Sequence, residues 1–177
     1  MPKSTSFHPR AVGCALLVLA LLGCSPQYDW REVRGEGAPY SILLPAKPAS
    51  LARPINLDGL QVTMTMTAAE VDGTTFAVGV VDLPEDAQAP HALTAMKTAL
   101  LKNLGGTVQR ETASGPGGAP EMIELVAVGT GADGRRKDLS ARFIARGKRV
   151  FQLVALGPEN ALTPDALDTF FTSFKSE

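Results

Sequence analysis

Apolar and polar residues alternate regularly between Leu60 and Glu70. One parity carries Leu60, Val62, Met64, Met66 and Ala68, and the other carries Gln61, Thr63, Thr65 and Thr67. A period of two is typical of a strand with one covered face. Asp72-Gly73 suits a tight turn, and Thr74–Leu83 follows as a second apolar run. The pattern therefore predicts a β-hairpin over residues 60–83.

Two segments place apolar residues at helical spacing. Pro90–Leu104 has Leu93, Met96, Leu100 and Leu104 on one face, and Gly105-Gly106 supplies a left-handed C-cap. The second helix begins at Leu162-Thr163-Pro164-Asp165, where Thr163 is the expected N-cap and Leu162 can pack onto Leu167. Its apolar face is expected to consist of Leu167, Phe170, Phe171 and Phe174.

Further strands are predicted at Tyr40–Leu44, Thr107–Ala113, Met122–Val128, Lys137–Ala145 and Arg149–Leu156, with Pro45–Pro54 as a connector. Met122–Val128 is apolar on both parities apart from Glu124, so we expect both of its faces to be covered. The strands from Met122 to Leu156 should form the middle of the sheet. The predicted class is α+β, a single largely antiparallel β-sheet of about seven strands with helices packed on its faces.

Residues 1–23 have the layout of a secretory signal peptide. Lys3 and Arg10 precede an apolar stretch from Ala11 to Leu22. As a helix this stretch spans about 18 Å, well short of the hydrocarbon core of about 30 Å. A cleaved leader is therefore favoured over the alternative, a short anchor that is retained.

The end of this leader, Leu21-Leu22-Gly23-Cys24, resembles the lipobox of bacterial lipoproteins. The resemblance implies that a dedicated peptidase cuts before Cys24 after its thiol has received a diacylglyceryl group. Fatty acyl chains such as palmitate then hold the protein on a membrane, since each buried methylene contributes about 0.8 kcal/mol. Ser25 in second place implies the periplasmic face of an outer membrane.

The expected organisation is therefore a signal peptide over residues 1–23, an acylated Cys24 with a flexible tether over residues 24–38, and a globular α+β domain over residues 39–177. Tyr28 and Trp30 stand out in the polar tether. Their amphipathic rings suit lipid headgroups, and they equally suit a fold-back onto the sheet.

Composition narrows the function classes. The chain has 177 residues, 17 Lys and Arg against 18 Asp and Glu, and two Cys. One domain is expected at this length, and a net charge of -1 gives no reason to bind nucleic acid. Because Cys14 leaves with the leader and Cys24 is acylated, we expect no thiol chemistry and no metal site. We expect His91, in the first turn of its helix, to face solvent without a catalytic partner.

Chemical motifs are few. Gly129-Thr130-Gly131-Ala132-Asp133-Gly134 matches a dinucleotide-binding string, but the next residues alternate as a strand instead of opening a helix. A turn is therefore expected there. No grouping of side chains predicts catalytic residues, so the chain is expected not to be an enzyme and to need no cofactor.

One segment is strongly basic. Seven cations and a single acid, Asp138, lie between Arg135 and Arg149. Arg135, Arg136, Lys137, Lys148 and Arg149 are candidates for contact with an anionic surface, such as lipid headgroups or an acidic partner. The alternative is a solvated sheet face whose charges discourage edge-to-edge pairing.

Two stretches resemble the PsbP-like superfamily: Tyr40-Ser41-Ile42-Leu43-Leu44-Pro45 near the start, and Arg142-Phe143 through Gly147–Leu153 to Phe170–Phe174 at the end. The resemblance implies a central antiparallel sheet between helices and an accessory, assembly or binding role. It transfers no catalytic residue.

The expected function is a non-enzymatic cell-envelope lipoprotein that acts as an accessory or binding subunit. It is held on the membrane by its lipid anchor and is associated with an envelope protein partner. The alternative is a periplasmic small-ligand carrier that uses a cleft between the sheet and the helix at residues 90–104, lined by Met64, Met66 and Met96. The sequence does not specify the partner or the oligomeric state.

Overall fold

The computed structural model describes residues 27–35, 37–131 and 133–176. Its long strands are β3 (Ala49–Leu57), β4 (Leu60–Val71), β5 (Thr74–Asp82), β6 (Thr107–Ser114), β7 (Met122–Thr130), β8 (Arg136–Arg146) and β9 (Arg149–Pro158). The short strands are β1 (Arg31–Arg34), β2 (Tyr40–Leu44) and β10 (Lys175–Ser176). The helices are α1 (Ala89–Leu104) and α2 (Pro164–Ser173). Two short 3-10 turns complete the elements: η2 (Asp86–Gln88) directly before α1, and η3 (Pro116–Gly118) between β6 and β7.

The seven long strands form one antiparallel sheet in the order β3-β4-β5-β9-β8-β7-β6. The predicted hairpin is formed by β4 and β5, and its turn is left-handed at Asp72 (φ 50°) and Gly73 (φ 75°). The predicted class, α+β on a seven-stranded antiparallel sheet with two helices, is therefore confirmed. The three short strands form a second, smaller sheet in the order β1-β2-β10.

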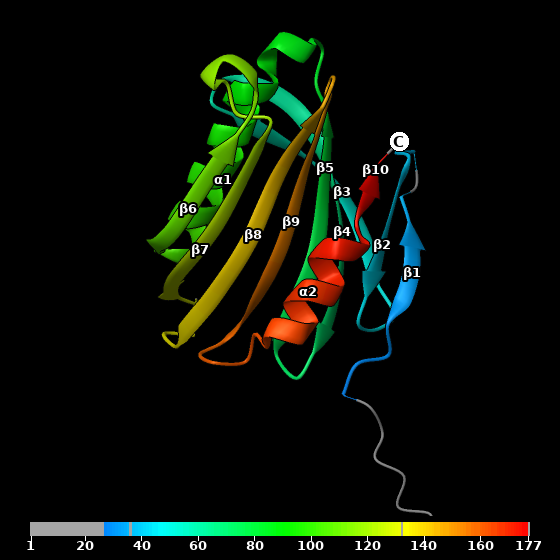
Figure 1. Cartoon of the computed structure of the whole chain (residues 1–177), viewed down its shortest axis with the longest axis vertical. Helices are drawn as coiled ribbons and strands as arrows, with labels where there is room; N and C mark the ends of the chain where they lie inside the picture. The colour runs from blue at the N-terminus through cyan, green and yellow to red at the C-terminus, as the bar shows by residue number, and fades with distance from the viewer. Residues whose placement is uncertain (1–26, 36, 132, 177) are drawn as a thin grey trace, which may run out of the picture.

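Each face of the large sheet has its own apolar core, and Figure 1 shows α1 behind the sheet and α2 in front of it. The α1 face is filled by residues such as Leu93 and Met96, which are 0% and 1% exposed. On the other face, Phe170 of α2 packs against Phe76, with ring centroids 5.2 Å apart. We call these the α1 face and the α2 face.

The expected connector at Pro45–Pro54 is wrong, because β3 begins at Ala49 and pairs with β4 along its whole length. Most side chains of β3 are exposed, so the strand lacks the alternation that marks a covered face. Pro54 lies opposite Thr63 within the pairing. A proline is tolerated there because β3 is an edge strand.

The chain also departs from the expected tether. Arg31–Arg34 forms β1 and pairs with β2. Tyr28 and Trp30 fold back onto the sheet, with ring centroids 6.2 and 5.9 Å from that of Phe76. The sequence leaves these rings either at lipid headgroups or folded back onto the sheet, and the structure has them folded back onto the sheet.

The middle of the sheet also differs from the expectation. Its centre is β9, flanked by β5 and β8, whereas β7 lies next to the edge strand β6. Along β7, Ile123 and Leu125 are buried on the α1 face, but Glu124 and Val126 on the other face are only half-buried. The expectation that both faces of this strand are covered is therefore wrong, and the uncovered face leaves room for a groove.

The start of α2 follows the predicted capping pattern. The Ala166 N–H donates to Thr163 Oγ1 at 3.3 Å, and Pro164 occupies the first turn. Replacing Thr163 by alanine leaves an amide proton without its partner, so we expect the free energy of unfolding to fall by about 1 kcal/mol. Urea denaturation of the two proteins measures the difference. A serine at the same position should restore stability, and an alanine variant as stable as wild type would contradict the cap.

Candidate functional site

A groove runs beside α2, over the strands that the helix does not cover. It has a volume of about 530 Å³. Its floor is formed by side chains of β6, β7 and β8, and its wall by Pro164, Leu167, Asp168 and Phe171 of α2. The groove exists because α2 lies over the middle of the sheet, as the contact between Phe170 and Phe76 shows. We call it the α2 groove.

The register of three strands assembles the floor. Thr112, Glu124 and Arg142 are directly opposite one another on β6, β7 and β8. Residues that pair in this way present their side chains on the same face. A second row, formed by Arg110, Val126 and Ser140, lies beside the first.

Arg142 is held in place by three contacts. Its Nε lies 2.6 Å from Glu124 Oε1, and its guanidinium carbon lies 4.7 Å from the centroid of the Phe171 ring. Its Nη1 also donates to the Phe171 carbonyl oxygen at 3.4 Å. A cation over an aromatic ring contributes about 0.5–1 kcal/mol at such partly exposed positions. Arg142 therefore joins the sheet to α2, and its charge is compensated by Glu124.

Two other charges in the α2 groove have no such compensation. Within the described part of the chain, neither Arg110 on the floor nor Asp168 on the wall forms an ion pair, and both side chains are exposed. Val126, Leu167 and Phe171 add apolar surface. The groove thus offers a cation, an anion, hydroxyl groups and apolar contacts together, which suits binding of a chemically mixed ligand.

The five basic residues singled out in the sequence do not form one patch. Arg135, Arg136 and Lys137 lie at the β7–β8 turn, and Lys148 and Arg149 lie at the β8–β9 turn. The eleven residues of β8 run between these turns, a length of about 36 Å at 3.3 Å per residue.

Acidic side chains also compensate most of this positive charge. Arg136 pairs with Glu159 at 3.1 Å, Lys137 with Asp133 at 3.7 Å and Arg149 with Asp82 at 2.7 Å. The acidic partners Glu159, Asp133 and Asp82 lie outside residues 135–149, so the composition of this segment alone does not predict the ion pairs. A role of these five residues in binding an anionic surface stays a prediction.

The β7–β8 turn contains the glycine-rich string. Gly134 N–H donates to the Gly131 carbonyl oxygen, and Gly131 N–H to that of Arg135, so the segment closes a hairpin. The Arg135 backbone N–H also donates to Asp133 Oδ1 at 3.1 Å. This bond lowers the pKa of the Asp133 carboxyl, and the charges of Lys137 and Arg135 act in the same direction. The expected turn is confirmed.

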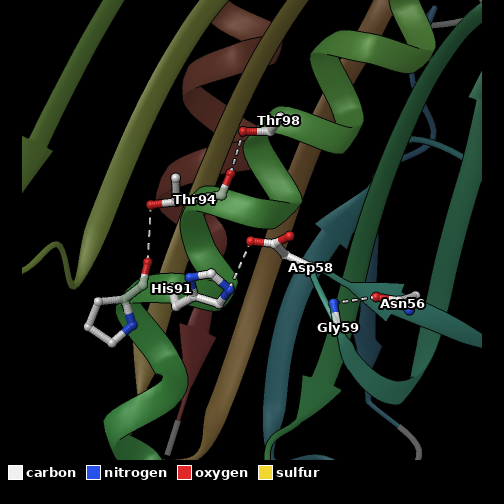
Figure 2. Close-up of polar contacts among 7 residues, drawn as sticks. Asn56, Asp58, Gly59, His91, Thr94 and Thr98 are labelled. Carbon is white, nitrogen blue, oxygen red and sulfur yellow. Dashed lines mark hydrogen bonds and ion pairs between the residues drawn. The ribbon is translucent and has the colours of Figure 1, made fainter.

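His91 has a partner that the sequence does not predict. Its Nε2 lies 3.3 Å from Asp58 Oδ2, as Figure 2 shows. Asp58 lies in the β3–β4 turn with φ 51°, and the Gly59 N–H donates to Asn56 Oδ1 across this turn. The side chains of His91 and Asp58 are 58% and 75% exposed, as expected for a solvent-facing histidine.

The nearby hydroxyl group of Thr94 is engaged elsewhere. Thr94 Oγ1 donates to the Pro90 carbonyl oxygen at 3.1 Å, and Thr98 Oγ1 donates to that of Thr94. Figure 2 shows both bonds running along α1, and neither of them joins a threonine to His91 or Asp58. The geometry is therefore that of a surface contact between α1 and the β3–β4 turn.

The methionines named for a carrier cleft lie on the α1 face. Met64 and Met96 are buried, and Met66 packs against the same core. The cavities that we describe are not lined by these residues. Over residues 27–35, 37–131 and 133–176, no three His, Cys, Asp or Glu side chains gather as metal ligands. In the same residues, no helix is long and apolar enough to span a bilayer.

Cys24, the predicted lipidation site, lies outside the described residues. The sequence did not single out Arg110, Glu124 or Asp168 as binding residues. The one signal was Glu124, the exception in an otherwise apolar strand, which indicates that one face of β7 is open.

No protein-family model matches the chain, and no curated protein matches it in sequence. Among solved structures, it is similar to the Ran-binding protein Mog1p of Saccharomyces cerevisiae. This pair has 9% identity and a TM-score of 0.49 over 84% of this chain and 96% of that chain. It is also similar to the extracellular domain of PknH from Mycobacterium tuberculosis, with 12% identity and a TM-score of 0.42 over 70% and 78% of the two chains.

Proposed function

We propose that this chain is a non-enzymatic lipoprotein of the cell envelope that binds a partner protein through the α2 groove. The leader and the lipobox-like Leu21–Cys24 support export and acylation, with the periplasmic face of an outer membrane as the location. The observation that carries the binding role is the uncovered sheet face beside α2, whose groove of about 530 Å³ contains the uncompensated charges of Arg110 and Asp168.

An extended segment of a partner envelope protein fits this groove best. The groove lies along strands β6, β7 and β8, and β6 is an edge strand, so one side is open to a chain. Arg110 and Asp168 favour a segment with an acidic and a basic side chain. Val126, Leu167 and Phe171 favour an apolar side chain between them. Such mixed contacts are typical of protein interfaces, where aromatic and Arg residues contribute most.

The carrier alternative has less support. The α1 face is closely packed by residues such as Leu93 and Met96, which leaves their side chains no exposed surface for a ligand. A filled core supports an accessory role over a carrier that would use this space.

Charge reversal in the α2 groove tests the proposal. A photo-reactive amino acid at Thr112, within the groove, should crosslink a partner in envelope extracts of cells that express the intact acylated protein. The double variant Arg110→Glu/Asp168→Lys reverses both charges of the groove. Each then has the same sign as the side chain of the partner segment that it meets and repels it, so we expect the crosslink to fall at least about tenfold.

The matched control is Lys102→Glu, an exposed charge on α1 at the other face of the sheet, which should leave the crosslink unchanged. Circular dichroism shows whether each variant folds. A crosslink of equal yield in the folded double variant would refute a role of the α2 groove in binding.

A further inference from the structure

A second groove lies on the α2 face, at the opposite edge of the sheet, and its lining is rich in hydroxyl groups. It has a volume of about 440 Å³ and lies between the threonine row of β4 and the segment that leads into β2. Ser50, Thr63, Thr65, Thr67, Tyr40 and Asp82 contribute its polar lining. We call it the threonine groove.

The alternation along β4 creates this lining. Because Met64 and Met66 point into the core of the α1 face, Thr63, Thr65 and Thr67 all stand on the α2 face. The register places Val80 of β5 beside Thr65, and Ser50 of β3 beside Thr67. Three hydroxyl groups therefore follow one another along a single strand, at a spacing of about 7 Å.

The hydroxyl groups differ in their availability. Thr67 is buried, and its Oγ1 lies 2.8 Å from Ser50 Oγ in a hydrogen bond. Within the described residues, the hydroxyl groups of Thr63 and Thr65 have no hydrogen bond to protein. Each can donate one bond and accept others, so the groove presents unused donors and acceptors together.

The charge at the groove is compensated. Asp82 is the one charged residue among those described that line it, and its Oδ1 accepts from Arg149 Nε at 2.7 Å. Its other carboxylate oxygen stays able to accept hydrogen bonds. An anionic ligand would be repelled by this carboxylate, and a cationic ligand would have to compete with Arg149 for it. A neutral ligand avoids both the repulsion and the competition.

We propose that the threonine groove binds a neutral saccharide of about two rings. A polyhydroxylated ligand can both donate to and accept from Thr63 and Thr65, and it can donate to Asp82. Its less polar ring faces can lie against the methyl groups of Thr63 and Thr65, which are exposed and half-buried. The volume lies within the range of about 300–1,000 Å³ that is usual for small-molecule sites. This proposal does not depend on partner binding in the α2 groove.

The test uses the full chain, purified in a zwitterionic detergent that contains no sugar. Saturation-transfer NMR measures binding of cellobiose, maltose and N,N′-diacetylchitobiose, with glucose 6-phosphate as an anionic probe. We expect at least one neutral disaccharide to bind and glucose 6-phosphate to bind more weakly. Thr65→Val keeps the branched shape and removes one hydroxyl group, so binding should weaken about threefold to tenfold.

Thr107→Val is the matched control, because Thr107 is an exposed threonine of β6 that lines neither groove, and this variant should bind the sugar as wild type does. Thr63→Val provides a second, more exposed variant if Thr65→Val does not fold. The proposal is overturned if no neutral disaccharide binds at about 10 mM. It is equally overturned if both valine variants bind normally, or if glucose 6-phosphate binds most tightly.

Discussion

Replacing Phe76 by alanine is expected to lower the free energy of unfolding by about 3–5 kcal/mol. Phe76 is 0% exposed, and its ring contacts those of Phe170, Trp30 and Tyr28 at centroid distances of 5.2, 5.9 and 6.2 Å. The substitution leaves a cavity where β5, α2 and the N-terminal segment meet. Urea denaturation, followed by circular dichroism, measures the loss.

The matched control for this prediction is Leu51→Ala. Leu51 lies on the edge strand β3 and is 65% exposed, so its loss should change stability by no more than about 0.5 kcal/mol. If Phe76→Ala were no more destabilising than Leu51→Ala, the packing of α2 and the N-terminal segment on this face would be wrong.

Replacing Cys24 by alanine is expected to abolish acylation. The lipobox resemblance makes the Cys24 thiol the attachment point of the lipid, and alanine has no thiol. Cells that express the protein with labelled palmitate should yield a labelled wild-type band and no label in Cys24→Ala. Because acyl chains contribute about 0.8 kcal/mol for each buried methylene, their loss removes the proposed anchor.

Cys14→Ala is the control for this second prediction. Cys14 lies within the proposed leader, so its replacement should leave labelling of the mature chain unchanged. Label that persists in Cys24→Ala would assign the lipid to another group and remove the support for a lipoprotein.

The regular elements could be predicted where the pattern is local. The alternation of β4, the Asp72-Gly73 turn and the cap at Thr163 depend on neighbours in sequence, and each is confirmed. The edge strand β3 was missed because the prolines in Pro45–Pro54 favour a connector, and a proline within a strand is tolerated only at a sheet edge. The strand β1 was missed because Arg31–Arg34 is mostly polar and has no apolar alternation, so its sequence resembles a tether. Its strand structure depends on pairing with β2.

The α2 groove depends on relations that lie far apart in the sequence. Its floor is formed by the register of β6, β7 and β8, which places Thr112, Glu124 and Arg142 in one row. Its wall is formed because α2 lies over the middle of the sheet. The ion pairs of Arg136 and Arg149 likewise use acids on other segments. Periodicity predicts which face a residue occupies, but it does not predict which partners stand opposite.

The intact mass of the protein, isolated from cell envelopes, shows whether the domain is lipid-anchored. We expect a chain that begins at Cys24, lacks residues 1–23 and carries the added mass of its acyl chains. A soluble, unmodified chain of 177 residues that still begins at Met1 would contradict it.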